Sequence, residues 1–388
     1  MPVQQRRSQR RNPRAGAGGR SGTCDACFPR SSTSVRTSIL AALPARTEGT
    51  VLGRRFFALA IALTLITPAG CSSADKPITV TRPALGTVVT INAYGENPRD
   101  VNAAIEDAFA VISAVEAELD AYSATSTIAA INAAPFEWHA LPADAVEILD
   151  AIERLGVAES FSPTLLGVVK LYDFGGDGHV PTEGELSAAL QTASMPERDD
   201  DRVRFLGIAS STAEPGLDFG GAAKGLALDR ARDALNAKGA VTGALVTAGS
   251  TTVTLGSKPD GEPWRVGVED PRDATVVRMT AEWTGNGALS TSGDYQHYFE
   301  HNGVWYHHIL DPKTGTPARG TRSLTVVGRF SGLDSDILST ALFVDGPDAA
   351  LAYATAHGLG VYIIDSEGRT HLASAPADSS ISLSEQSE

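Results

Sequence analysis

The chain has 388 residues, of which 42% are hydrophobic and 20% are charged, a composition typical of a globular protein and not of a disordered one. It carries 46 acidic against 32 basic residues, for a formal net charge of −14. An acidic surface repels a phosphate backbone, so this balance argues against nucleic acid as a partner.

The first 50 residues differ in composition from the remainder of the chain. They are rich in Arg, Ser, Gly and Pro and show no hydrophobic period. A valine codon can start translation in bacteria, so we interpret residues 1–50 as a misassigned or disordered extension and expect the true start near Val51. The Cys24 and Cys27 pair in this extension has no second pair at metal spacing and predicts no site.

Residues 51–71 have the pattern of a bacterial secretory signal. Arg54 and Arg55 precede a short apolar run, and small residues precede Cys71. The run is too short to predict a membrane-spanning helix. We predict lipid attachment at Cys71 and a lipid-anchored, extracytoplasmic location on the cell membrane, with plain cleavage as the alternative. The arginine pair leaves general or twin-arginine export open.

The body that comes after Cys71 contains no further cysteine, so it has neither a disulfide nor a thiol nucleophile. Residues 1–70 hold eleven arginines and two acids, which leaves 21 basic against 44 acidic residues, near −23, in the remainder. The body is therefore expected to be an acidic domain that lies near a membrane through its lipid and not through a basic face.

Hydrophobic periodicity and turn residues predict the elements of the body. In chain order we expect a tether at 72–83 with a strand-like stretch at 78–81, a strand at 85–94, helices at 101–119 and 142–155, a loop with a short helix at 173–200, a helix at 222–237, strands at 241–247, 251–255, 264–268, 276–284, 304–310 and 322–328, helices from near 336 and at 347–357, a strand at 360–364, and a disordered tail at 374–388. Runs of strands with interspersed helices predict an α+β fold in one domain, residues 84–373.

A histidine-containing turn comes after one of the predicted strands. The run from Tyr306 to Pro317 reads Tyr-His-His-Ile-Leu-Asp-Pro-Lys-Thr-Gly-Thr-Pro, and its Asp-Pro and Thr-Gly pairs stop the strand. A histidine held at a stiff turn is suited to act as a general base near neutral pH. The alternative is a hairpin in which His307 and His308 only cap the end of a strand.

Asp336 and Thr340 are four residues apart on a predicted helix, so their oxygens share one face. A carboxylate beside a hydroxyl suits Mg²⁺, which takes its remaining ligands from water and substrate phosphates. The alternative is that Asp336 caps the helix and Thr340 is a satisfied core hydroxyl.

The run from Asp218 to Gly225 is a glycine-containing turn that opens a helix. Its backbone N–H groups favour an anion, and Lys224 adds a positive charge suited to a phosphate. The spacing is not that of a Walker A loop, and no Ser or Thr comes after the lysine. An ordinary junction between a loop and a helix remains the alternative.

Three further segments carry polar or aromatic residues. Thr291–Tyr295 comes after a predicted strand, and Tyr122, Ser162–Thr164 and Tyr172–Gly175 offer rings and small residues that could hold a planar ligand. Packing of these aromatic residues in the core is the alternative.

In this order, these segments resemble the bacterial FAD:protein FMN transferases, the ApbE family once labelled thiamine biosynthesis lipoproteins. The resemblance runs from about Leu85 to Leu359. Its most specific pieces are Leu85–Thr87, Asp218–Asp229, Thr291–Tyr295, His308–Pro317 and Asp336–Phe343. It implies an ApbE-like α+β fold with mixed or antiparallel sheets and packed helices.

The resemblance also implies a role for each matching position. It implies FAD contacts at Leu85, Tyr122, Ser162, Pro163, Thr164, Asp218 and Lys224. It implies metal binding by the carbonyl of Gly221 and the side chains of Asp336 and Thr340, and catalysis by His308 as base with Lys224 assisting. Departures from the family pattern are Leu85 in place of Met, Ser162 in place of Asp, and Thr247–Thr251 in place of Asn-x-Gly-Gly-Asp.

The function implied by the resemblance is Mg²⁺-dependent transfer of FMN from FAD to a Thr or Ser hydroxyl of an acceptor protein, with release of AMP. Two alternatives stay open. One is a Mg²⁺-dependent FAD pyrophosphatase, in which water replaces the acceptor hydroxyl. The other is a lipid-anchored flavin-binding protein without turnover. The sequence does not identify the acceptor or the oligomeric state.

Overall fold

The computed structural model describes residues 76–207, 214–375 and 380–386. The predicted N-terminal extension, the export signal, Cys71 and the first residues of the predicted tether lie outside these ranges. Within them, no helix is long and apolar enough to cross a membrane.

An eight-stranded sheet is the centre of the fold, and every pairing within it is antiparallel. Its order is β1-β2-β6-β7-β10-β13-β14-β15, so β10 crosses over to a place between β7 and β13. The strands are β1 (Ile78–Ala84), β2 (Thr87–Tyr94), β6 (Gly243–Ala248), β7 (Thr251–Gly256), β10 (Gly287–Gly293), β13 (Thr321–Gly328), β14 (Gly360–Asp365) and β15 (Thr370–Ala373).

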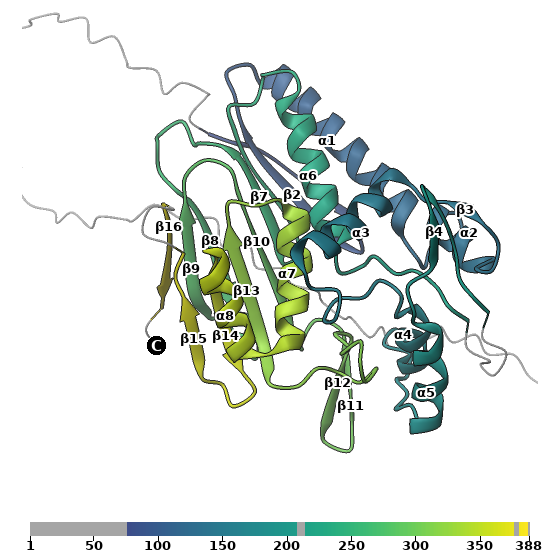
Figure 1. The fold of residues 1–388 in the computed structure, drawn as a ribbon. Helices are drawn as coiled ribbons and strands as arrows, with labels where there is room; N and C mark the ends of the chain where they lie inside the picture. Colours follow the sequence, from purple (N-terminus) through teal and green to yellow (C-terminus); the bar gives the residue numbers. More distant parts are fainter. Residues whose placement is uncertain (1–75, 208–213, 376–379, 387–388) are drawn as a thin grey trace, which may run out of the picture. The chain divides into compact units, whose positions relative to one another are not determined.

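Helices cover one face of this sheet (Figure 1). The helices on this face are α1 (Pro98–Leu119), α3 (Ala143–Leu155), α6 (Ala223–Asn236), α7 (Gly332–Asp345) and α8 (Pro347–His357). Helix α1 begins where Asn97 accepts a hydrogen bond from the backbone N–H of Arg99 at 3.0 Å, with Pro98 in the first turn, where its missing N–H costs nothing. Side chains of α1, α6 and α7 bury the main core against the sheet.

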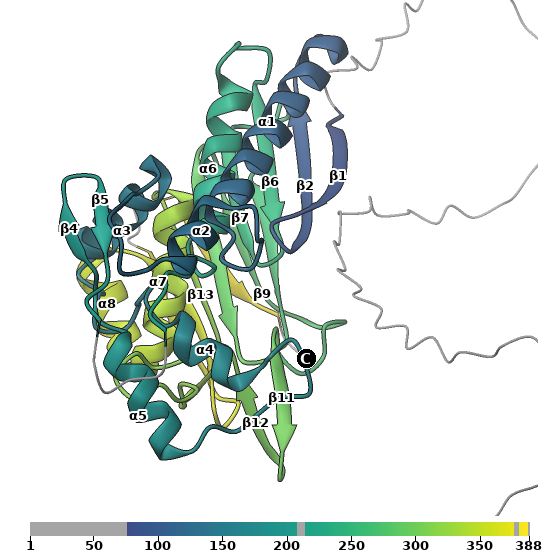
Figure 2. The ribbon, with the colours of Figure 1, turned by 90° about the vertical axis from the view of Figure 1, so that its right-hand side faces the viewer.

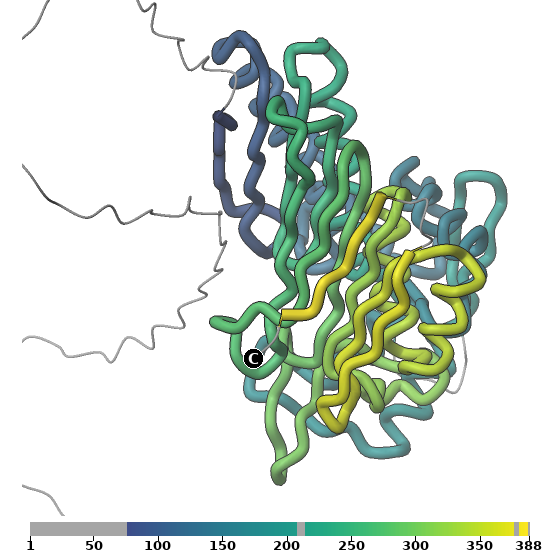
Figure 3. Tube along the Cα trace, turned by 90° about the vertical axis from the view of Figure 1, so that its left-hand side faces the viewer, coloured from purple at the N-terminus to yellow at the C-terminus, as the bar shows by residue number. Residues whose placement is uncertain are grey.

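A second, three-stranded sheet lies against the opposite face, where the C-terminal strands face the viewer in Figure 3. It is formed by β16 (Ile381–Glu385), β9 (Val277–Trp283) and β8 (Trp264–Glu269), in that order. Trp264 and Trp283 pack against Leu289 and Tyr362 of the large sheet in a separate apolar cluster. Large apolar side chains from both sheets exclude water between them.

The remaining elements lie at one end of the sheet and around its margin (Figure 2). They are α2 (Thr127–Ala133), the short strands β3 (His139–Ala140), β4 (Glu197–Asp199) and β5 (Arg202–Arg204), the helices α4 (Leu166–Tyr172) and α5 (Glu183–Thr192), and the hairpin β11 (Tyr298–His301) and β12 (Val304–His307). Tyr172 stacks on Phe174 at 5.2 Å, and its hydroxyl donates to the carbonyl of Gly315 at 3.0 Å. Core packing is therefore the correct interpretation for Tyr172, and this cluster supports the histidine turn.

The α+β prediction is confirmed, and most predicted helices and strands form within a few residues of their expected bounds. The expected bounds at both ends of the body were wrong. The strand-like stretch expected at 78–81 is confirmed as part of β1, but β1 continues to Ala84 and pairs along its length with β2, so it belongs to the body and not to a tether. Part of the tail expected to be disordered is β16, which pairs with β9 from Ile381 to Glu385. In both segments apolar residues alternate with polar ones, and a neighbouring strand with open hydrogen-bonding groups accepts them.

Candidate active site

The start of α6 is held by a continuous set of hydrogen bonds around Asp218. The Tyr122 hydroxyl donates to Oδ2 of Asp218 at 2.8 Å, and the backbone N–H of Gly220 donates to Oδ1 at 2.9 Å. The backbone N–H of Asp218 donates to the carbonyl of Pro163 at 2.7 Å. The structure therefore brings Tyr122, the Ser162–Thr164 segment and Asp218 together.

Lys224 lies in the first turn of α6 and points back along it. Its Nζ donates to the carbonyl of Gly220 at 3.2 Å and lies 3.7 Å from Oδ2 of Asp336. The lysine thus connects the turn that opens α6 to the carboxylate on α7. A single ammonium group in this position supplies a positive charge where the backbone N–H groups of a helix start already favour anions.

Asp336 is buried, with 4% of its surface exposed, and its carboxylate joins three elements. Oδ2 accepts from the backbone N–H of Gly225 at 3.0 Å, and Oδ1 accepts from the hydroxyl of Thr251 at 3.1 Å. Burial raises the pKa of the Asp336 carboxyl, while Lys224 and these hydrogen bonds act in the opposite direction. A bound cation would favour the charged form of this buried carboxylate and lower its pKa.

Thr340 lies one turn further along α7, on the same face as Asp336. Its Oγ1 is 3.2 Å from the hydroxyl of Ser292 on β10. A Cβ placed on Gly221 would lie 3.7 Å from Thr340 Oγ1, so the backbone of Gly221 approaches this hydroxyl closely. Asp336, Thr340 and Gly221 are therefore neighbours, although they come from one helix and from the turn before another.

The donors present fit Mg²⁺. Among residues 76–207, 214–375 and 380–386 no group of three or more His, Cys, Asp and Glu side chains could hold a metal alone. Mg²⁺ does not require such a group, because it binds through one or two carboxylates and takes its other ligands from water and substrate phosphates. Asp336, the Thr340 hydroxyl and the Gly221 carbonyl are oxygen donors of this hard type.

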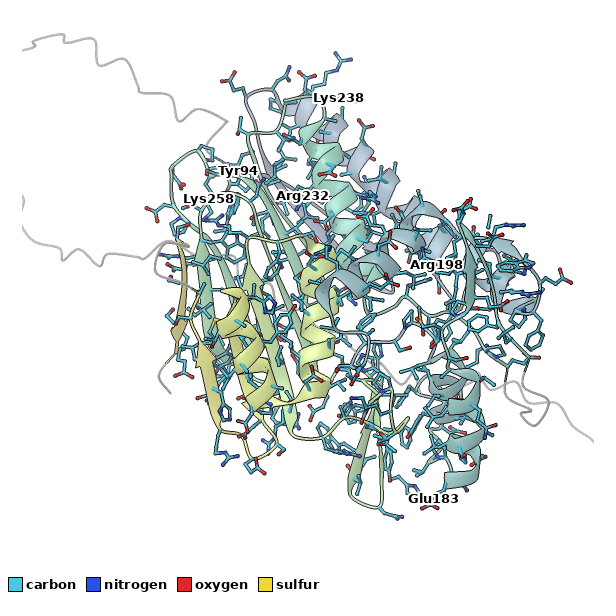
Figure 4. All side chains as sticks on the ribbon, viewed as in Figure 1. Tyr94, Glu183, Arg198, Arg232, Lys238 and Lys258 are labelled. Atoms are coloured by element: carbon cyan, nitrogen blue, oxygen red, sulfur yellow. The ribbon has the colours of Figure 1, made fainter. Side chains whose placement is uncertain are left out.

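Helix α7 is fixed against α6 by a buried carboxylate and by two glycines. Asp229 on α6 accepts from the backbone N–H groups of Gly332 and Leu333, both at 2.9 Å, and pairs with Arg232 at 2.8 Å. Figure 4 labels Arg232 on α6. A Cβ on Gly225 would lie 2.1 Å from the carbonyl oxygen of Gly332, so the two backbones touch at this point. The contact sets the position of Asp336 on α7.

The alternative in which Asp336 caps its helix is wrong. Helix α7 begins at Gly332, one turn earlier than expected, and its N-cap is Ser331, whose hydroxyl accepts from the N–H of Asp334 at 2.9 Å. Asp336 is thus an interior residue of the helix. Its side chain is directed at α6 and not at its own backbone, which is the arrangement a ligand requires.

The histidine turn is stiff, as predicted. The backbone N–H of Gly315 donates to the carbonyl of Asp311 at 2.8 Å, and the N–H of Lys313 donates to the Asp311 carboxylate at 2.8 Å. His307 is buried and its Nε2 lies 2.9 Å from the carbonyl oxygen of Ala318. His307 therefore holds the turn together.

His308 is half-buried, and its ring meets that of His297 edge to face at 5.1 Å between centroids. Its Nδ1 is buried and has no hydrogen-bond partner. Burial, followed by the neighbouring His297, His307 and Lys224, lowers the pKa of His308 to about 3. The imidazole is therefore neutral near pH 7, and the charge of Lys224 is near enough to contribute to the lowered pKa.

Leu85 occupies the turn between β1 and β2 with a positive φ of 56°, and Gly86 comes next at 66°. Positive φ is strained for leucine and is often found where the backbone serves a site. The neighbouring turn between β6 and β7 reaches it, because a Cβ on Gly249 would lie 3.1 Å from the hydroxyl of Thr87. Thr251 comes after that turn and contacts Asp336, so Leu85 lies at the margin of the same site.

Several residues of the site were not among the predicted site residues. They are Asp229, Thr251, Ser292 and His297. Asp229 could have been found as a carboxylate on the apolar face of a helix, a position that demands a partner. Thr251 and Ser292 carry no such signal, because hydroxyl residues in strands are usually structural. Cys71, the predicted lipidation site, lies outside the described residues.

Comparisons with known proteins agree with one another. The model of the ApbE family matches residues 85–363. A FAD:protein FMN transferase from Vibrio cholerae is 30% identical over 314 residues, which cover 77% of this chain and 91% of that protein. One from Rhodobacter capsulatus is 36% identical over 191 residues, 48% of this chain, so the match spans only 35% of that relative. The apo structure of the flavinyl transferase ApbE from Pseudomonas stutzeri superposes with a TM-score of 0.65 at 30% identity and covers 78% of this chain and 96% of that one.

Proposed function

Because the chain belongs to the ApbE family, we propose that it transfers FMN from FAD to a Thr or Ser hydroxyl of an acceptor protein, with Mg²⁺ as cofactor and AMP as the second product. The observation that carries this proposal is the meeting of a buried carboxylate, Asp336, with Lys224 at 3.7 Å beside a neutral histidine. Simple flavin binding requires no such base.

The reaction breaks the pyrophosphate bond of FAD between the FMN phosphorus and the bridging oxygen. A P–O bond forms between the same phosphorus and the acceptor hydroxyl, and AMP leaves with the bridging oxygen. Asp336, Thr340 and the Gly221 carbonyl would hold Mg²⁺. The metal would neutralise the charge that develops on the leaving AMP.

The chain's own groups would then bind and orient the reactants. Lys224 and the N–H groups that open α6 would bind the phosphates of FAD. Tyr122 and the Ser162–Thr164 segment, joined through Asp218, would hold the nucleotide in place. His308 would take the proton of the acceptor hydroxyl as it attacks, and its neutral form at pH 7 is the form that can do so.

The proposal extends to location. The export signal at 51–71 and the lipid predicted at Cys71 would place the body on the extracytoplasmic face of the membrane. Globomycin, which blocks lipoprotein signal cleavage, should make the unprocessed chain accumulate in cells. Intact mass of the mature chain should show a diacylglyceryl group at Cys71, and a mature chain without lipid would refute the anchor.

The activity is tested with the purified chain, FAD, Mg²⁺ and a library of peptides that share a central Thr with randomised neighbours. We expect AMP release together with flavin-fluorescent peptides of increased mass. Asp336→Asn and His308→Asn should each reduce transfer at least about 100-fold, since one removes a metal ligand and the other the base. The exposed Glu183→Gln on α5 is the matched control. AMP without labelled peptide would identify a pyrophosphatase, and unchanged FAD would favour simple binding.

A further inference from the structure

Two pairs of buried serines join β10 to α7. Ser290 and Ser292 are two residues apart on β10, so they lie on one face of the sheet, and Ser335 and Ser339 are four residues apart on α7. These two spacings match, at about 6.6 Å along a strand and about 6 Å along a helix. The Oγ atoms are accordingly 2.6 Å apart between Ser290 and Ser335 and 2.9 Å apart between Ser292 and Ser339. The second pair lies beside the proposed metal ligands.

The hydrogen bonds around Ser292 have a fixed direction. The hydroxyl of Ser339 donates to the backbone carbonyl of Asp336 at 3.0 Å. A hydroxyl has one hydrogen and a carbonyl can only accept, so Ser292 must donate to Ser339. The hydrogen of Ser292 is then used, and in its 3.2 Å contact with Thr340 the threonine must be the donor. The chain therefore runs from Thr340 through Ser292 and Ser339 to the backbone of Asp336.

This direction prepares the Thr340 hydroxyl to act as a ligand. An oxygen that binds a cation must offer a lone pair and turn its own hydrogen away. Because the hydrogen of Thr340 is directed at Ser292, the lone pairs of its Oγ1 stay available. Ser292 and Ser339 are 7% and 1% exposed, whereas Thr340 is less completely buried. The chain thus begins at its most accessible hydroxyl and ends in the core.

Without Ser292, the Thr340 hydroxyl would have a competing partner. A threonine inside a helix commonly donates to the carbonyl four residues earlier, which for Thr340 is that of Asp336. Ser339 donates to this same carbonyl, and the Thr340 hydroxyl contacts Ser292 instead. A bound cation would also polarise the Thr340 hydroxyl and strengthen its donation to Ser292. The cation and the chain would therefore favour the same orientation.

We propose that Ser292 is a positioning residue for the metal, which orients the Thr340 hydroxyl through a hydrogen-bond chain that Ser339 completes. The inference rests on the proposed function, in which Thr340 binds Mg²⁺. Ser292 acts through Thr340 and takes no part in the chemical step. Together with Thr251, which donates to the Asp336 carboxylate at 3.1 Å, it means that hydroxyls of the sheet hold both metal-binding side chains of α7.

The experiment measures metal binding without turnover. Mn²⁺, a paramagnetic cation that accepts the same oxygen ligands, is titrated into the chain with FAD and no acceptor peptide, and free Mn²⁺ is read by electron paramagnetic resonance. A titration of Mn²⁺ and FAD without protein supplies the blank. Ser292→Ala should weaken Mn²⁺ binding about tenfold, the usual effect of losing a group that orients a ligand.

Ser339→Ala tests the direction of the chain. Ser292 then loses its acceptor and can turn its hydrogen towards Thr340, so Mn²⁺ binding should weaken by about the same factor. Urea titration checks that each variant is folded, and this variant carries the test if Ser292→Ala does not fold.

The matched control is Thr325→Val on β13. Thr325 is fully buried, and its hydroxyl lies 2.8 Å from that of Thr291. It pairs with Thr291, the neighbour of Ser292, and so lies on the opposite face of the sheet. Thr325→Val removes one buried hydroxyl-to-hydroxyl hydrogen bond, as Ser292→Ala does, but it should leave Mn²⁺ binding unchanged.

A double-mutant cycle separates positioning from general packing. If Ser292 acts through the Thr340 hydroxyl, Ser292→Ala should have little further effect on Mn²⁺ binding in a Thr340→Val background. A further loss below about twofold is within the usual limit for independent changes. A purely structural role would weaken binding by the same factor in both backgrounds.

Three results would overturn the inference. They are wild-type Mn²⁺ binding in Ser292→Ala, wild-type Mn²⁺ binding in Ser339→Ala, and an equal loss from Ser292→Ala with and without the Thr340 hydroxyl. In each of these cases the wild-type chain binds Mn²⁺ with FAD, so the proposed function stands while the inference falls. A wild-type chain that binds no Mn²⁺ in the presence of FAD would instead refute the metal-dependent function on which the inference rests.

Discussion

Gly225→Ala tests whether the contact between α6 and α7 sets the active site. A Cβ at this position would lie 2.1 Å from the carbonyl oxygen of Gly332 and 2.8 Å from the backbone nitrogen of Leu333. Side-chain Cβ atoms essentially never approach other atoms closer than 3.0 Å, so the helices must separate by at least 0.9 Å. That movement carries Asp336 away from the N–H of Gly225, which now donates to it at 3.0 Å.

The expected cost is the sum of three effects. Overpacking costs about 1–3 kcal/mol, and the weakened hydrogen bond to a buried carboxylate adds about 1.5–3 kcal/mol. The better helix propensity of Ala offsets about 1 kcal/mol. We expect a net loss of about 1.5–5 kcal/mol in the free energy of unfolding, measured by urea titration. A displacement near 1 Å at reacting groups lowers kcat/KM for transfer about 100-fold.

Gly184→Ala on α5 is the matched control. The atom nearest to a Cβ at Gly184 is the hydroxyl of Thr182 at 4.0 Å, so the same substitution has space and should be neutral or slightly stabilising. Wild-type stability and activity in Gly225→Ala would refute the reasoning. Lower stability with unchanged kcat/KM would show that the contact serves folding alone.

Acid should destabilise the fold through the paired histidines. Burial lowers the pKa of His307 to about 4 and that of His308 to about 3, so both stay neutral in the folded state while the unfolded chain protonates them below about 6.5. The stability that the two neutral histidines contribute is present above pH 6.5 and is lost as the pH falls, by up to about 4 kcal/mol at pH 5. A free energy of unfolding that does not change between pH 6.5 and pH 5 would contradict these pKa values. Asp229→Asn should lower the free energy of unfolding by about 3 kcal/mol in urea titration, because one of the two N–H donors of α7 then faces an amide donor. An unchanged midpoint of urea unfolding would show that Asp229 does not hold α7 in place. Tyr122→Phe should raise the KM for FAD about tenfold, since the Asp218 carboxylate loses its hydroxyl donor, and steady-state kinetics with an unaltered KM would separate Tyr122 from nucleotide binding.

Much of the fold could be predicted because apolar residues recur at regular spacing along its helices and strands. Helix α1 repeats apolar residues at helical spacing, and the prediction missed its start by three residues because Pro98 and Arg99 belong to the first turn but carry no apolar signal. Strand β10 was missed altogether. It is buried on both faces, so the sequence Gly-Ala-Leu-Ser-Thr-Ser-Gly shows no alternation, and small residues here serve the close approach of α7.

The site could be predicted in part. The spacing of Asp336 and Thr340 predicted a shared helix face, and the structure confirms that they lie together beside Gly221. The hydrogen bond from Thr251 to Asp336 could not be predicted, because it depends on how α7 packs against β7 in the folded protein. Residues that act through tertiary contacts leave no local pattern in a sequence.

The edge strand β1 has a consequence for which proteins this chain can reach. Six residues separate Cys71 from Ile78, so with the proposed lipid in place the first residue of β1 is held within about 25 Å of the bilayer surface. The seven residues of β1 then lead to the Leu85 turn, which adds about 20–25 Å. A body held on so short a tether could reach only target hydroxyls that lie close to the membrane surface. The length of the tether would therefore select acceptor proteins by the distance of their target hydroxyl from the membrane.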